Sequence, residues 1–180
     1  MFVRTLRGLA AALILVAAVT TAAEAQASSR AGVSAGLSLP MGDWGDVVGM
    51  GFTVGGQYAF ALGSSKASLR INADYSRFGG EDAAGTDNGS MIGGVVNVVY
   101  PIQASAAWKP YILGGLGFYQ AKVENTGGGS NDDSALAFNV GAGYEFKLGN
   151  SNLFTEVRYL SVQTDGSSAN TLPIVIGLRF

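Results

Sequence analysis

The last ten residues decide the fold, and they read Thr171-Leu172-Pro173-Ile174-Val175-Ile176-Gly177-Leu178-Arg179-Phe180. Residues two apart in a β-strand share a face. One face of this stretch is wholly apolar and carries Leu172, Ile174, Ile176 and Leu178. The opposite face carries Pro173, Val175, Gly177 and Arg179. A charge that alternates with large aliphatic residues predicts a strand with hydrocarbon on one side and water or a paired charge on the other.

The N-terminus has the three parts of a secretory signal peptide. Arg4 and Arg7 supply positive charge, residues 9–19 form an uncharged apolar run, and Ala23-Glu24-Ala25 matches the small-x-small cleavage pattern. Ala25-Gln26-Ala27 is a second candidate cleavage site. The apolar run is too short to span a bilayer comfortably. We therefore expect export through the inner membrane and removal of this segment.

Cleavage divides the chain into a signal peptide, residues 1–25, and one domain, residues 26–180. Removing Arg4, Arg7 and Glu24 from 11 basic and 13 acidic residues leaves a net charge of −3. This balance argues against a nucleic-acid partner. The domain has no second long apolar segment, and no stretch predicts an amphipathic helix.

The domain falls into eight strand-length segments in which apolar residues alternate with small or polar ones. They are residues 31–39, 51–61, 69–76, 91–100, 110–123, 135–147, 153–163 and 171–180. Four polar connections, residues 40–50, 79–90, 124–134 and 164–170, alternate with three that are mostly shorter. An even number of strands with loops at one end and short turns at the other is typical of outer-membrane barrels.

Alternation alone does not say which face lies inside, because a soluble lipocalin-like barrel has the same period with its polar face outward. Here one face is rich in Gly, Ser and Ala and carries fewer charges than a soluble surface usually does. The other face is aliphatic and aromatic, which is too much apolar area to leave in water. We therefore expect the small face to line the lumen, with charges at Arg70, Asp74, Glu145, Lys147, Glu156, Arg158 and Arg179.

Aromatic residues gather toward the strand ends, which predicts two girdles at the membrane interfaces. The girdle expected at the short-turn end comprises Phe60, Tyr100, Trp108, Tyr111, Phe146, Phe154 and Phe180. The girdle expected at the loop end comprises Tyr75, Phe78, Phe118, Tyr119, Phe138 and Tyr159.

Four segments resemble recurring strands of small porin-like outer-membrane β-barrel proteins, the OmpA/OmpX/OmpW-like eight-stranded barrel domains. They are Gly51-Phe52-Thr53-Val54-Gly55-Gly56, residues 110–117, residues 154–159 and Gly177-Leu178-Arg179-Phe180. The resemblance implies an all-β, eight-stranded antiparallel up-and-down transmembrane β-barrel in the Gram-negative outer membrane, in contact with outer-membrane lipid and lipopolysaccharide. Both ends of the domain would be periplasmic and the acidic loops external.

The C-terminal strand also resembles the assembly signal of that family, which has a terminal aromatic residue preceded by apolar residues at alternate positions. The resemblance implies that the barrel assembly machinery reads this strand, and that periplasmic chaperones accompany the chain during biogenesis. The matching positions in this sequence are Ile174, Ile176, Leu178 and Phe180.

The sequence contains no His and no Cys. The small-barrel enzymes of the outer membrane resemble one another in relying on a catalytic His, a base that titrates near neutrality. Zinc sites and nucleophile–base pairs of the usual kinds also need His or Cys. No loop has a calcium-binding spacing. We therefore expect no enzyme activity, no cofactor and no metal site.

Three functions remain open from the sequence. Eight strands enclose a space that side chains about fill, and buried charges must pair or be hydrated, so a structural ion-pair plug is favoured. The same charges could instead line a narrow conduit for small or hydrophobic solutes. A soluble lipid carrier is the third alternative. The acidic loops predict either a solvated surface or contact with lipopolysaccharide through divalent cations or with an external surface partner.

Overall fold

The computed structural model describes residues 30–81, 84–102, 109–126, 130–149, 151–164 and 167–180. The expected signal peptide and Trp108 lie outside the described residues. Among the described residues, no helix is long and apolar enough to cross a membrane.

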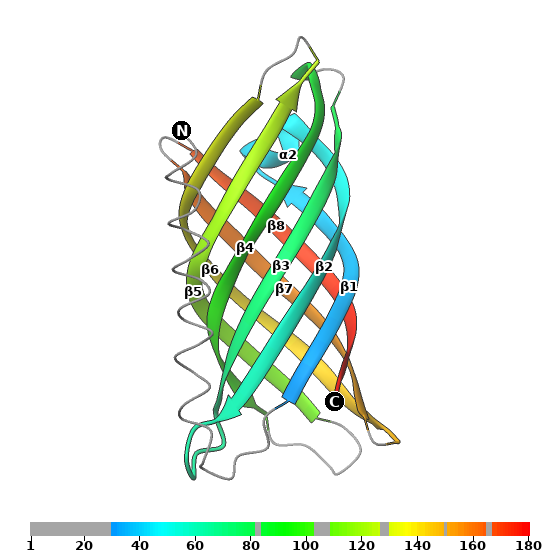
Figure 1. Cartoon of the computed structure of the whole chain (residues 1–180), viewed down its shortest axis with the longest axis vertical. Helices are drawn as coiled ribbons and strands as arrows, with labels where there is room; N and C mark the ends of the chain where they lie inside the picture. Colours follow the sequence, from blue (N-terminus) through cyan, green and yellow to red (C-terminus); the bar gives the residue numbers. More distant parts are fainter. Residues whose placement is uncertain (1–29, 82–83, 103–108, 127–129, 150, 165–166) are drawn as a thin grey trace.

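Eight antiparallel strands form a closed barrel in which each strand pairs with its neighbours in sequence order (Figure 1). The strands are β1 (Arg30–Met41), β2 (Val48–Ala61), β3 (Ser68–Gly80), β4 (Thr86–Pro101), β5 (Lys109–Asn125), β6 (Ser130–Leu148), β7 (Ser151–Thr164) and β8 (Ser167–Arg179). The last strand closes on the first, from Gly32 opposite Arg179 to Met41 opposite Asn170. The eight-stranded up-and-down barrel predicted from the sequence is confirmed.

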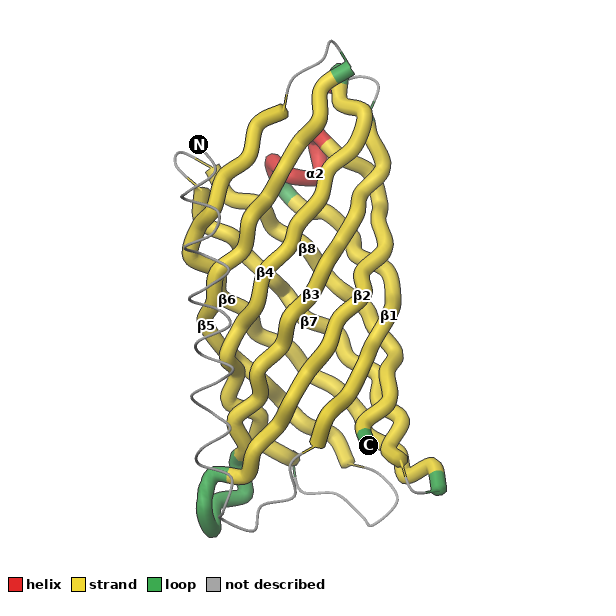
Figure 2. Tube along the Cα trace, in the orientation of Figure 1, coloured by secondary structure: helices red, strands yellow, loops and turns green. Residues whose placement is uncertain are grey.

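The strands at the loop end are longer than the hydrophobic pattern predicted, as the strand tube in Figure 2 shows. Much of the two connections expected at residues 79–90 and 124–134 is strand. The hairpin register continues through these polar stretches, with Gly79 opposite Asn88 and Lys122 opposite Asp132. Backbone hydrogen bonds hold a ladder together whatever the side chains are, so a strand that leaves the apolar zone loses its hydrophobic alternation without losing its structure.

A short helix, α2 (Asp43–Val47), connects β1 and β2 and was not predicted. It lies within the ring of strands at the loop end (Figures 1 and 2). Trp44 is its buried residue, and the indole meets the Phe78 ring edge-on with centroids 5.7 Å apart. The helix escapes detection because five residues are too few to show a 3.6-residue period. It therefore places the Trp44 indole inside the barrel mouth.

The C-terminal strand presents its two faces as the sequence predicted. Ile174 and Ile176 are exposed on the outer face, whereas Val175 and Arg179 are buried in the lumen. β4, whose facing is ambiguous in the sequence, places Ile92, Val98 and Tyr100 outward and Met91, Val95 and Val99 inward. Both faces of β4 are apolar because part of the lumen is apolar as well.

Candidate functional site in the barrel interior

Buried ion pairs lie in the short-turn half and the middle of the lumen, and we call this group the lumen charge cluster. The Arg70 guanidinium on β3 donates two hydrogen bonds to the Glu156 carboxylate on β7, from Nη1 to Oε2 at 2.7 Å and from Nη2 to Oε1 at 2.9 Å. Bidentate pairing fixes the orientation of both groups. The members of the lumen charge cluster are Arg70, Asp74, Glu145, Glu156, Arg158 and Arg179.

Arg158 extends the cluster toward the middle of the lumen. Its Nη1 donates to Asp74 Oδ2 at 3.1 Å, and its Nε lies 3.4 Å from Glu156 Oε1. The Tyr119 hydroxyl donates to the same Asp74 oxygen at 2.9 Å. Asp74 is therefore held by a cation and a phenol, and Glu156 by two cations.

Tyr111 joins the remaining ion pair to this group. Its hydroxyl donates to Glu156 Oε2 at 2.7 Å and accepts a hydrogen bond from Arg179 Nη2 at 3.1 Å. Arg179 forms an ion pair with Glu145, and its guanidinium carbon lies 4.4 Å from the centroid of the Phe154 ring. Arg179 on β8 thus contacts side chains from β5, β6 and β7, which ties the closing strand to the lumen.

The lumen charge cluster is formally neutral, because three guanidinium groups face three carboxylates. A buried ion pair contributes little net stability over an apolar packing of the same volume, since both charges lose their hydration. Removing one member is different, because it leaves an uncompensated buried charge that costs about 3–5 kcal/mol. The cluster therefore tolerates the loss of a single partner poorly.

Inward-facing glycines make room for these large side chains. Gly55 lies directly opposite Asp74, and Gly141 directly opposite Arg158. A Cβ at Gly143 would collide with the Tyr111 ring, and one at Gly177 would collide with the Phe154 ring. Each large group lies across the bare backbone of a neighbouring strand. The glycine-rich inner face is thus the space into which the charges and aromatic rings pack.

The loop half of the lumen is apolar. Trp44 and Val48 enter it from α2 and the start of β2, and Gly89 leaves the space that both side chains occupy. The Tyr119 hydroxyl links this layer to the lumen charge cluster through Asp74. The apolar cluster consists of Trp44, Val48, Phe78, Met91, Val95, Tyr119, Ala121, Ala137, Leu160, Val162 and Ala169.

The prediction from the sequence that Lys147 is one of the lumen charges is wrong. Lys147 shares the inward parity of Glu145, but its side chain is exposed one residue before β6 ends at Leu148. The alternation of side chains along a strand decides whether a residue faces inward or outward. Whether an inward-facing residue is enclosed by the barrel depends on its position along the strand. Lys147 therefore lies outside the lumen charge cluster.

The expected aromatic girdles need a second correction. Phe78, Tyr111, Tyr119 and Phe154 are buried in the lumen, whereas Tyr100, Phe118, Phe138 and Phe180 are exposed on the outer face as expected. The sequence does contain a sign of this placement. Tyr111 and Tyr119 lie on the same face of β5 as Gly115 and Gly117, which is the face of small residues. An aromatic on a glycine-rich face predicts a lumen group.

The outer face is apolar around the whole barrel, and this is the surface that a membrane protein presents to lipid. Exposed large apolar side chains occur on seven of the eight strands, including Val33, Phe52, Ile92, Ile112, Leu116, Phe118, Val140, Val157 and Ile176, and the outward Leu69, Ile71 and Tyr75 of β3 are half-buried. Residues 9–180 match the family model described as outer membrane protein beta-barrel domain. The chain belongs to this family. It is an integral outer-membrane β-barrel protein and lies in the cell outer membrane, so the soluble lipocalin-like carrier is excluded.

Several solved structures share the fold of this outer-membrane barrel. Neisserial surface protein A is 19% identical with a TM-score of 0.66, and the match covers 85% of this chain and 97% of that one. The attachment invasion locus protein Ail of Yersinia pestis is also 19% identical, with a TM-score of 0.53 and coverage of 84% and 97%. Ail has also been crystallised with the heparin analogue sucrose octasulfate. Comparison with curated protein sequences finds no match.

The same fold also carries enzymes. The outer membrane enzyme PagL is 16% identical to this outer-membrane barrel, with a TM-score of 0.50 and coverage of 85% of this chain and 99% of that one. Fold alone therefore does not decide the question of activity. The present sequence has no His, and within the described part of the chain no three potential metal ligands lie together.

Proposed function

We propose that this outer-membrane barrel has a structural or surface-interaction role, with a lumen plugged by its own side chains and no enzymatic activity. The observation that supports the plug is the two-layer filling of the lumen, a neutral ion-pair cluster below and an apolar cluster under Trp44 above. An eight-stranded barrel is only wide enough for side chains to fill. The absence of His supports the non-enzymatic assignment, because a general base that titrates near neutrality is missing.

A plugged lumen predicts that the purified protein in a planar bilayer shows no stable ion conductance. The same protein in liposomes should give no swelling in isotonic sugar solutions. Trp44→Ala should stay closed in both assays, because the lumen charge cluster remains intact beneath the missing indole. Large, long-lived openings in the parent protein would instead establish the small-solute porin, and they would contradict the plug.

We further propose that residues 1–25 are a signal peptide that directs export, and that periplasmic chaperones and the barrel assembly machinery then fold residues 26–180. The loops would face an external partner. The exposed residues Asp43, Asp46, Glu81 and Asp87 make this end acidic. These carboxylates would repel a polyanion of the kind that Ail binds, so we propose a cationic partner or contact through divalent cations.

Topology can be tested on whole cells, because the chain has no Cys to interfere. Ala84 lies exposed between β3 and β4 at the loop end, and Ser64 lies exposed in the turn between β2 and β3. Ala84→Cys should react with a membrane-impermeant maleimide on intact cells, whereas Ser64→Cys should react only after the outer membrane is opened. Reaction of Ser64→Cys but not Ala84→Cys on intact cells would reverse the proposed orientation.

A further inference from the structure

Two basic side chains flank Ser90 on the outer wall near the loop end. Arg77 on β3 pairs in register with Ser90 on β4, and Ser90 pairs with Lys122 on β5. Arg77 and Lys122 both have the outward parity of their strands, opposite to the buried Ser76 and Ala121. Among the described residues, these are the two cations that the loop half carries outside the lumen. A surface that is otherwise acidic therefore has one place where two cations surround a single carboxylate, that of Glu124, and this place carries a net positive charge.

The cations on this wall are available to a ligand. Lys122 Nζ pairs with Glu124 Oε1 at 2.7 Å, but the two side chains are 41% and 39% exposed. Exposed pairs of this kind are worth about 0–1 kcal/mol, so an anion of higher charge can take the place of Glu124. The guanidinium of Arg77 is exposed and suits bidentate binding of a phosphate.

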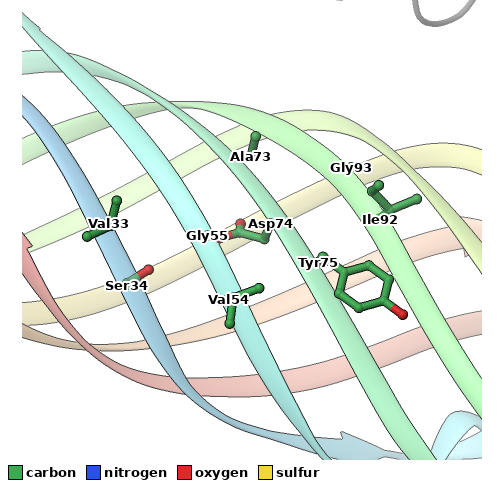
Figure 3. Close-up of a pocket in the computed structure, with 9 residues that line it drawn as sticks. All are labelled: Val33, Ser34, Val54, Gly55, Ala73, Asp74, Tyr75, Ile92 and Gly93. Carbon is green, nitrogen blue, oxygen red and sulfur yellow. The ribbon is translucent and has the colours of Figure 1, made fainter.

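An apolar groove lies beside these cations on the same outer wall. It crosses β1 to β4, has a volume of about 480 Å³, and is bordered by Val33, Val54, Ala73, Tyr75 and Ile92 (Figure 3). Asp74 also borders it, but its carboxylate is directed to Arg158 in the lumen. The floor is low because Gly56 and Ala73 pair side by side on the outer face.

The groove and the cations are adjacent along the strands. Tyr75 pairs with Ile92 across β3 and β4, and each lies two residues from Arg77 or Ser90 on the same outer face. Two residues of a strand span roughly 6.5–7 Å. The groove therefore begins one side-chain position nearer to the membrane centre than the two cations. The acyl chain of a lipid whose charged headgroup binds the cations would run in this direction.

We propose that this wall of β1 to β5 is a binding site for lipopolysaccharide, with a lipid A phosphate on Arg77 and Lys122 and one acyl chain in the groove. Charge complementarity selects a phosphorylated headgroup, and the apolar lining selects a hydrocarbon chain. The site lies wholly on the outer surface. It is thus independent of whether the lumen is plugged, and a conductance result does not bear on it.

The test uses the mature protein refolded in phosphatidylcholine nanodiscs, titrated with diphosphoryl lipid A and followed by native mass spectrometry. We expect one lipid A to be retained per barrel. Arg77→Gln combined with Lys122→Gln should weaken binding about tenfold or more. Ala73→Phe, which fills the groove, should weaken it similarly while the cations remain. Because both faces of a nanodisc are accessible, the result does not depend on orientation.

Matched controls separate a built site from general electrostatics. Lys66→Gln combined with Lys147→Gln removes two exposed cations at the short-turn end, and Val140→Phe adds a ring on the outer face of β6; both should bind as the parent does. Heat-modifiable gel migration verifies folding of each variant. Equal loss in the Lys66/Lys147 variant, no loss in Ala73→Phe, or equal binding of lipid A without its phosphates would each overturn the proposal. Competition by millimolar inorganic phosphate that fully displaces lipid A would likewise reject the acyl-chain part.

Discussion

Deletion of Phe180 is expected to remove most of the folded protein from the outer membrane while leaving its folding in detergent nearly intact. Phe180 is 66% exposed, and its backbone N–H donates a hydrogen bond to the Ala31 carbonyl of β1 at 2.9 Å. Full burial of a Phe side chain contributes roughly 1.5–3 kcal/mol, and a ring this exposed contributes less. A loss of stability in that range cannot by itself empty the membrane of protein.

The large effect follows if the assembly machinery reads the C-terminal strand before the barrel closes. Ile174, Ile176 and Leu178 share the outer face with Phe180 and are all exposed, so nothing in the folded barrel covers the proposed signal. The measurement is immunoblotting of outer-membrane and periplasmic fractions from cells that express the deletion. Unfolded, protease-sensitive protein should accumulate in the periplasm.

Arg179→Ala provides the opposite pattern as a control. Arg179 lies on the inner face and holds Glu145 and Tyr111, so its loss should lower stability in detergent while the outer-face signal stays complete. Delivery of this variant to the outer membrane should be affected less than delivery of the Phe180 deletion. Normal outer-membrane levels without Phe180 would remove the assembly signal from the proposal.

Replacement of Glu156 by Gln should produce the second large effect, a loss of about 3–5 kcal/mol in the free energy of unfolding. The Glu156 carboxylate receives Arg70, Arg158 and the Tyr111 hydroxyl, so the neutral amide leaves an excess of buried positive charge. Gln keeps the volume of the side chain, which separates the loss of charge from the creation of a cavity. Urea unfolding of the refolded barrel in phospholipid vesicles, followed by tryptophan fluorescence, measures the difference.

Lys147→Gln is the matched control for the charge change. Lys147 is exposed outside the lumen charge cluster, so its replacement should change the unfolding free energy by less than about 0.5 kcal/mol. Arg70→Gln combined with Glu156→Gln should recover part of the loss, because it removes a charge of each sign. A Glu156→Gln barrel as stable as the parent would mean that the cluster is hydrated and its charges are not confined as the contacts indicate.

The pairing of the lumen charges could not be predicted from the sequence, although six of the seven candidate residues do meet. Arg70 and Glu156 are 86 residues apart, and their contact depends on the register of every intervening strand pair. A shift of one residue at any hairpin would turn an entire face from lumen to lipid. For the same reason, no local pattern shows that Tyr111 bridges the Glu156 and Arg179 groups.

The sequence by itself determined the number of strands, their order and, for every strand except β4, the face that it presents to lipid. The alternation of Ile174, Ile176 and Leu178 is a local property, and an apolar face must leave water whatever the rest of the chain does. Only the tertiary structure decided which side chains share the enclosed space. Arg179 and Lys147 have the same inward parity, but Arg179 lies within the barrel and Lys147 at its rim. The position of each residue along the barrel axis is fixed when the barrel closes, because it depends on the registers of all eight strand pairs together.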